Sequence, residues 1–99
     1  MVYESALLRI TPGHNQAFEA AAAQAAPLFQ QADGALSFRL DQRVEDPNAY
    51  VLTVGWTTVT AHTGHFRSSP AFAQWRELVS PFFAADPEVH HTTHIHTGF

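Results

Sequence analysis

The aromatic stretch between Gly55 and Phe83 constrains the fold of this chain more than any other segment. It holds both tryptophans of the 99-residue sequence and two of its seven histidines. A face with this much apolar area must be buried against another element, so the stretch is expected to line any binding pocket. The side chains that recur at helical spacing, three or four residues apart, are Phe72, Trp75, Val79, Phe82 and Phe83.

Local signals predict where the helices of this stretch begin. Ser69 can accept a hydrogen bond from the free N–H groups of a first helical turn, and Pro70 has no N–H group to leave unpaired there, so the longer helix is predicted to begin at Pro70. A short helix is expected before it, capped by a threonine at 57–58. His62 and His65 are three residues apart in that short helix and are predicted to share a face.

Alternation and turn residues predict the other elements. A helix is expected between the turns at Pro12-Gly13 and Asp33-Gly34. Leu36, Phe38 and Leu40 alternate with polar residues, which indicates a strand with one apolar face, whereas the next strand is apolar on both faces. Strands are predicted at 2–11, 35–43, 49–56 and 89–98. This order is typical of a ferredoxin-like α+β sandwich, and we predict a single domain over residues 1–99.

Such a sandwich leaves one face of the sheet without helices. Leu7, Val51 and Thr53 are predicted to lie on that bare face, where a monomer would expose apolar area to water. We therefore predict a homodimer in which two sheets stack face to face, a dimeric α+β barrel.

Composition excludes several classes of partner and site. Five Lys and Arg residues, none of them clustered, give no phosphate-binding footprint, so nucleic acid is not expected as a partner. The absence of cysteine excludes disulfides, thiolate metal sites and a cysteine nucleophile. No stretch approaches the ~20 apolar residues of a membrane helix, and no leader segment is recognised, so a cytoplasmic protein without membrane contact is predicted.

Several short motifs in a fixed order resemble the antibiotic biosynthesis monooxygenase domains, and the similarity covers nearly the whole chain. The motifs are Pro12-Gly13, Asp33-Gly34-Ala35, Asp46-Pro47, Trp56, His65, Ser69-Pro70, Phe72 and Trp75. The resemblance implies a dimeric α+β barrel with a pocket between helices and sheet in each subunit. It also implies a cofactor-independent monooxygenase acting on a small aromatic, a quinol or a polycyclic phenol.

Chemistry of this kind needs a base, a dry site and aromatic walls, because a phenol must lose its proton before it can pass an electron to oxygen. His65 is the candidate base. Arg67 and Arg76 are candidates for stabilising the developing anion. The candidate walls are Trp56, Phe66, Phe72 and Trp75.

Structural roles remain open for the same residues. Aromatic side chains at helical spacing also form ordinary cores, His65 can make a structural hydrogen bond, and His62 is expected to be solvated or to cap a helix. The second hypothesis is therefore a non-catalytic dimeric barrel that binds a small aromatic metabolite or has a structural or stress role.

Neither a metal nor haem is expected as a cofactor. Histidines at alternate positions of a strand can bind a metal, but no carboxylate accompanies them on one side, so lining of a subunit interface is preferred. Haem-degrading relatives of the fold carry an asparagine on the first strand and a histidine ligand near the position of Trp75, and this chain has neither. The histidines in question are His90, His91, His94 and His96.

Overall fold

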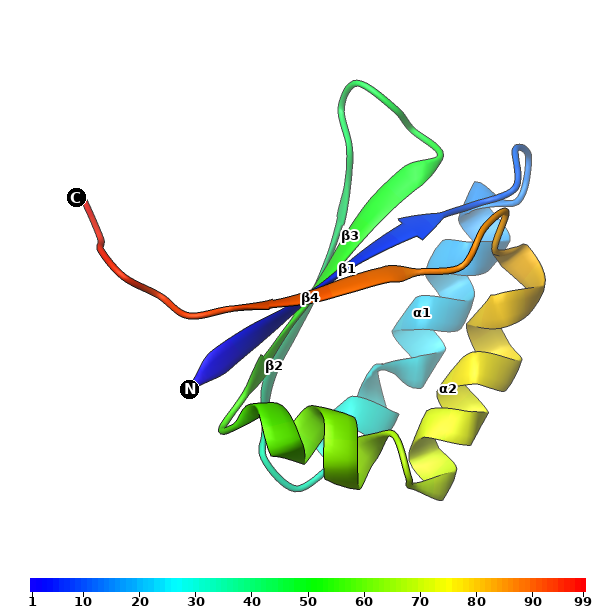
Figure 1. The fold of residues 1–99 in the computed structure, drawn as a ribbon. Helices are drawn as coiled ribbons and strands as arrows, with labels where there is room; N and C mark the ends of the chain where they lie inside the picture. The colour runs from blue at the N-terminus through cyan, green and yellow to red at the C-terminus, as the bar shows by residue number, and fades with distance from the viewer.

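The computed structural model describes all residues from 1 to 99 and shows a four-stranded antiparallel sheet with two helices on one face (Figure 1). The strand order is β2-β3-β1-β4, and every neighbouring pair is antiparallel. The predicted ferredoxin-like α+β fold is confirmed. The elements are β1 (Val2–Arg9), α1 (Asn15–Gln30), β2 (Ala35–Gln42), β3 (Ala49–Trp56), η1 (Ala61–Phe66), α2 (Pro70–Val79), η2 (Ser80–Phe82) and β4 (Glu88–Thr92).

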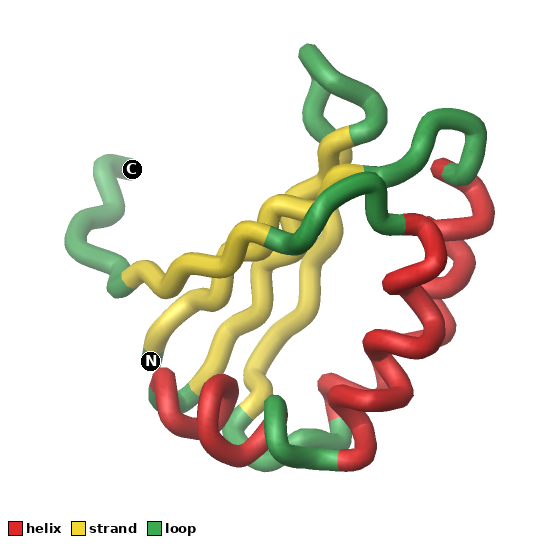
Figure 2. Tube along the Cα trace, turned by 45° about the vertical axis from the view of Figure 1, so that its right-hand side comes forward, coloured by secondary structure: helices red, strands yellow, loops and turns green.

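The core fills the space between the sheet and the two helices, and the opposite face of the sheet carries no helix (Figure 2). On β3, side chains at alternate positions from Tyr50 to Trp56 are all buried, as the sequence predicted. Phe29 of α1 lies at the centre of an aromatic cluster, 4.7 Å from Phe66 and 5.1 Å from Trp75 between ring centroids. Aromatic pairs at this separation stabilise a core beyond the area they bury.

The predicted capping signals are present at both helices of the aromatic stretch. The side chain of Ser69 accepts a hydrogen bond from the N–H of Phe72, and Pro70 is the first residue of α2. Thr58 Oγ1 accepts one from the N–H of Ala61 at the start of η1. These bonds fix where the two helices begin.

The short helix η1 is a π-helical turn, in which the N–H of Arg67 reaches the carbonyl of His62 five residues earlier. The wider turn changes which side chains lie above one another. His62 is buried and His65 is exposed, so the prediction that they share a face is wrong. The expectation that His62 is solvated is wrong for the same reason.

Two strands differ from their predicted form. A bulge between Ala35 and Ser37 shifts the register of β2 against β3, and Leu36 is consequently 54% exposed instead of lying on the apolar face with Phe38. The last strand ends at Thr92, and residues 93–99 have no regular structure and run away from the body of the protein (Figure 1). Thr92 pairs with Tyr3, the second residue of β1, so the residues after Thr92 have almost no further length of β1 to pair with.

Candidate functional site

A cavity of about 540 Å³ lies between α2 and the half of the sheet formed by β1 and β4. This volume is within the range of small-molecule sites. Its wall is mixed, with apolar side chains from three strands and α2 and a few ionisable groups. The lining residues are Glu4, Ala6, Leu8, Leu52, His62, Arg67, Phe72, Trp75, Arg76, Phe83, Asp86, Pro87 and Val89.

Four of the seven residues predicted from the sequence meet at this cavity: Phe72, Trp75, Arg67 and Arg76. The two aromatic side chains come from the sheet-facing side of α2, where Trp75 is almost fully buried. Neither arginine makes a salt bridge, so both positive charges are available to an anion in the cavity.

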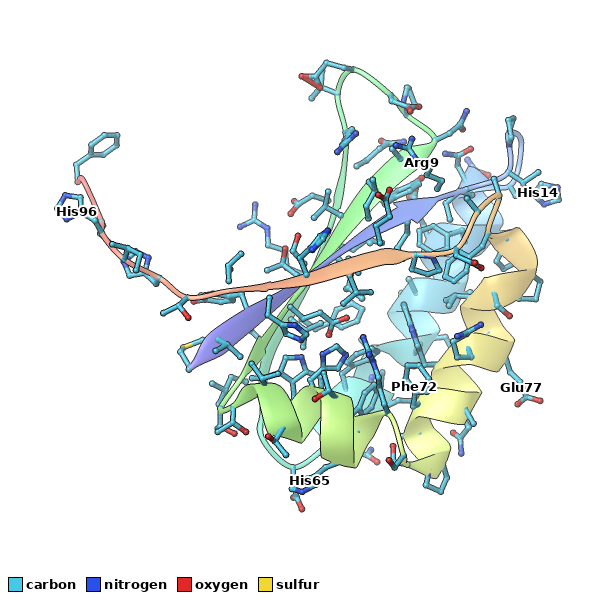
Figure 3. All side chains as sticks on the ribbon, in the orientation of Figure 1. Arg9, His14, His65, Phe72, Glu77 and His96 are labelled. Carbon is cyan, nitrogen blue, oxygen red and sulfur yellow. The ribbon has the colours of Figure 1, made fainter.

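The other three predicted residues lie elsewhere. Trp56 is fully buried behind the cavity wall, where its ring stacks on that of His62 at 5.2 Å and 15°. His65 and Phe66 line a separate hollow of about 320 Å³ between α1 and the start of α2. Figure 3 shows Phe72 between α2 and the sheet, whereas His65 lies on the outer side of η1. The structure therefore does not bring His65 together with Trp75 and the arginines.

Three ionisable side chains form a chain of contacts from the cavity to the edge of the sheet. Glu4 Oε1 lies 3.3 Å from His62 Nε2, and His62 Nδ1 lies 2.8 Å from His91 Nε2. Glu4 Oε1 also accepts a hydrogen bond of 3.0 Å from Trp56 Nε1. These residues come from β1, η1 and β4, and Glu4 pairs directly with His91 across the strands.

Burial dominates the electrostatics of this chain of contacts. It raises the pKa of Glu4, which the hydrogen bond from Trp56 and the charge of Arg67 oppose. It lowers the pKa of His62 to about 4, with smaller effects in the same direction from Arg67 and His91. The pKa of His91 is lowered by burial first and then by Arg67 and His90. His62 is consequently a neutral imidazole at neutral pH.

Sequence reasoning missed Glu4, the central residue of this arrangement. One signal was present: Glu4 alternates with Val2, Ala6 and Leu8 on the side of β1 that faces the helices, so a carboxyl group stands on an otherwise apolar face. A charged group is rarely buried in such a position without partners. The partners come from segments 52 or more residues away, and no local pattern reveals them.

Two further observations bear on cofactors and membranes. No three His, Asp or Glu side chains are arranged to hold a metal ion, and His94 contacts only Thr97 Oγ1, at 2.8 Å, outside the sheet. No helix of the structure has the length and apolar character required to cross a bilayer.

Comparison with known proteins identifies the family. The sequence model for "Antibiotic biosynthesis monooxygenase" matches residues 1–78. The chain belongs to the antibiotic biosynthesis monooxygenase family. The match covers the strands and helices up to α2, including most of the residues that line the cavity.

Individual proteins are similar to this chain in sequence or in fold. The uncharacterized protein YczJ of Bacillus subtilis (strain 168) is 37% identical over 91 residues, which cover 92% of this chain and 96% of YczJ. The crystal structure of a Bordetella bronchiseptica protein that carries the same family name superposes with a TM-score of 0.94 at 41% identity, covering 95% of this chain and 96% of the other. SnoaB of Streptomyces nogalater, a cofactor-independent oxygenase, shares the fold with a TM-score of 0.84 at 21% identity, covering 98% and 95% of the two chains.

Proposed function

We propose that this protein is a monooxygenase of its family, which binds a small electron-rich aromatic in the cavity between α2 and the sheet and oxidises it with molecular oxygen without a metal or flavin. The observation that supports this most is the composition of the cavity wall. Phe72 and Trp75 supply flat apolar surface, and Arg67 and Arg76 supply unpaired positive charge. A phenol held there would be shielded from water along its ring and stabilised as the phenolate.

The chemistry requires few protein groups. The phenol loses its O–H proton to a base, and the phenolate passes an electron to oxygen; one oxygen atom enters the product and the other leaves as water. The substrate supplies the electrons. Within the cavity the groups able to take the proton are Glu4, His62 and Asp86, and Glu4 and His62 are the buried ones. A base at His65 would act in a different hollow.

A matched pair of substitutions tests which hollow holds the substrate. The larger side chain of Val89→Phe fills part of the cavity beside Glu4, and that of Ala71→Phe fills part of the hollow beside His65. Oxygen uptake with a panel of hydroquinones and polycyclic phenols, after subtraction of spontaneous autoxidation, is the measurement. We expect Val89→Phe to abolish uptake or raise KM strongly and Ala71→Phe to retain the activity of the parent.

The opposite result would assign the reaction to the hollow of His65. Saturable binding of a phenol without any oxygen uptake would instead support the non-catalytic binding protein. Calorimetric titration with the same panel separates this outcome from a chain that binds no aromatic at all.

A further inference from the structure

Resting on the proposed function, we propose that Glu4 takes the proton of the bound phenol and that His62 and His91 carry it from the cavity to the edge of the sheet. Glu4 touches the substrate and is therefore the catalytic residue. His62 and His91 act through it and form the relay. The three residues are joined by two contacts of 3.3 and 2.8 Å, and these contacts are the path.

The geometry leaves Glu4 one oxygen for the substrate. All polar contacts of its side chain use Oε1, which faces His62 Nε2 and Trp56 Nε1. Because Glu4 lines the cavity, Oε2 is the oxygen that can meet a phenol hydroxyl there. The tryptophan N–H cannot leave Oε1, since Trp56 itself is fully buried, so the carboxyl group is held in one orientation.

Two arrangements of protons satisfy both contacts, and they differ by one proton. With Glu4 ionised, His62 donates through Nε2–H to Glu4 and His91 donates through Nε2–H to His62 Nδ1. With Glu4 protonated, Glu4 donates to His62 Nε2 and His62 donates through Nδ1–H to His91 Nε2, which leaves the proton of His91 on Nδ1.

The second arrangement converts to the first with a complete balance of protons. The O–H bond of Glu4 breaks as His62 Nε2–H forms, His62 Nδ1–H breaks as His91 Nε2–H forms, and His91 Nδ1–H breaks to release a proton to solvent. During turnover the phenol O–H bond breaks as an O–H bond forms at Glu4 Oε2, while the Oε1–H bond breaks toward His62, so the fixed carboxyl group takes up one proton and passes on another. No histidine becomes an imidazolium cation, in agreement with the lowered pKa of His62.

The surroundings favour outward movement. Arg67, which follows η1, places a positive charge near all three groups and stabilises both ionised Glu4 and a phenolate in the cavity. His90 is the other titratable group near His91, and Trp56 from β3 is the other polar neighbour of Glu4. His91 is half-buried on β4, the edge strand, which gives the relay an end in solvent.

Nitrogen and carbon NMR of the unmodified protein tests the relay without substrate. As the pH falls through the raised pKa of the Glu4 carboxyl, His62 should change its tautomer: Nε2 loses its proton and Nδ1 gains one. The midpoint of this change should equal the midpoint measured at the Glu4 carboxyl carbon. A His62 that gains a proton on both nitrogens at that midpoint, or that keeps its tautomer throughout, overturns the relay.

Kinetics of three variants tests the same path during turnover. Glu4→Gln keeps an acceptor for Trp56 but no base, so kcat should fall by about 10²–10⁴-fold, the usual contribution of a general base. His91→Ala should lower kcat with little change in KM, and added imidazole should restore it. The control is His94→Ala, which should keep the turnover of the parent, because His94 lies beyond β4 and its imidazole bonds Thr97 Oγ1.

Each kinetic result decides one step. Parent-like turnover of Glu4→Gln removes Glu4 as the base, and loss in His91→Ala that imidazole does not restore assigns His91 a purely structural role. If the parent oxidises no member of the panel, the proposed oxygenase fails while the NMR titration still decides the relay.

Discussion

At the scale of single residues, the most informative feature is a carboxyl group on an apolar strand face. Glu4 is 6% exposed between Val2 and Ala6, and its charge is stabilised by one indole N–H and by the field of Arg67. Removing one partner of a buried polar group costs more than the bond contributes on balance, because the remaining group is left desolvated. The cavity therefore carries a group whose protonation depends on its neighbours.

This dependence leads to a prediction for Trp56. Trp56→Phe keeps the ring in the core but deletes the N–H that lowers the pKa of Glu4. We expect the pKa of Glu4, followed through its carboxyl carbon by NMR, to rise further above its usual range. An unchanged midpoint would show that the indole does not influence the ionisation of Glu4.

A second residue-scale prediction concerns His62 and acid stability. Its pKa is about 4 in the folded chain against 6.5 ordinarily, so the unfolded state binds the proton more tightly. The stabilising contribution is complete above pH 6.5 and is lost as the pH falls toward 4, which amounts to about 3 kcal/mol at 1.36 kcal/mol per pKa unit. Glu4 acts in the opposite sense, since its pKa is raised and its contribution is lost as the pH rises.

Urea unfolding at a series of pH values measures this effect. His62→Gln should flatten the fall in the free energy of unfolding between pH 6.5 and 4. The exposed neighbour provides the control, and His65→Gln should keep the slope of the parent. An identical acid slope in both variants would contradict the assignment to His62.

At the scale of elements, the turn that joins α1 to β2 depends on Gly34. Its φ of +86° lies in the left-handed region, and a Cβ there would stand 2.7 Å from Ala61 Cβ and 2.8 Å from Thr57 Oγ1. The carbonyl of Gly34 also accepts the N–H of Thr57 at 2.8 Å. Close approach at this point joins the start of β2 to the end of β3.

Gly34→Ala is accordingly predicted to be more damaging than Gly13→Ala. Both positions have a positive φ, which costs an alanine about 1–2 kcal/mol, but Gly13 has open space around it. The clash at Gly34 adds roughly 1–3 kcal/mol, typical of overpacking. Chemical denaturation measures the free energy of unfolding of the two variants. Equal losses of this free energy would show that the side chains around Gly34 move aside without cost.

Much of this element structure could be predicted because its signals are local. Ser69 and Pro70 mark the start of α2, and alternation identifies β3. The bulge that exposes Leu36 and the π-helical turn that separates His62 from His65 depend on pairing and packing with other elements, for which neighbouring residues give no sign. Phe72 and Trp75 could be predicted for the cavity wall because they follow helical spacing, whereas Glu4, His62 and His91 meet only in three dimensions and no sequence pattern pointed to their meeting.

At the scale of the whole molecule, the bare face of the sheet supports the prediction of a homodimer. Leu7, Val51 and Thr53 are half-buried on that face although no helix covers it. A standard stable interface buries about 1,600 Å² in total. Stacking of two such faces would remove their exposed apolar side chains from water.

A charge on that face should prevent the association. Val51→Glu is expected to shift the protein to a monomer in sedimentation velocity at micromolar concentration, whereas Val44→Glu, at a hairpin position that is 92% exposed, should leave the parent's state unchanged. A monomeric parent, or a dimer that tolerates Val51→Glu, would refute the face-to-face arrangement.

The position of β1 in the sheet fixes an order of events during synthesis. β1 is made first, yet its partners are made late: the separation along the chain is 49 − 9 = 40 residues for Arg9 and Ala49 and 92 − 3 = 89 residues for Tyr3 and Thr92. Pairing over such separations is slow, and an unpaired strand edge attracts strands of other chains. A nascent chain that stalls before residue 88 leaves one edge of β1 open, and pairing with β4 replaces that edge with a five-residue strand too short to recruit a neighbour.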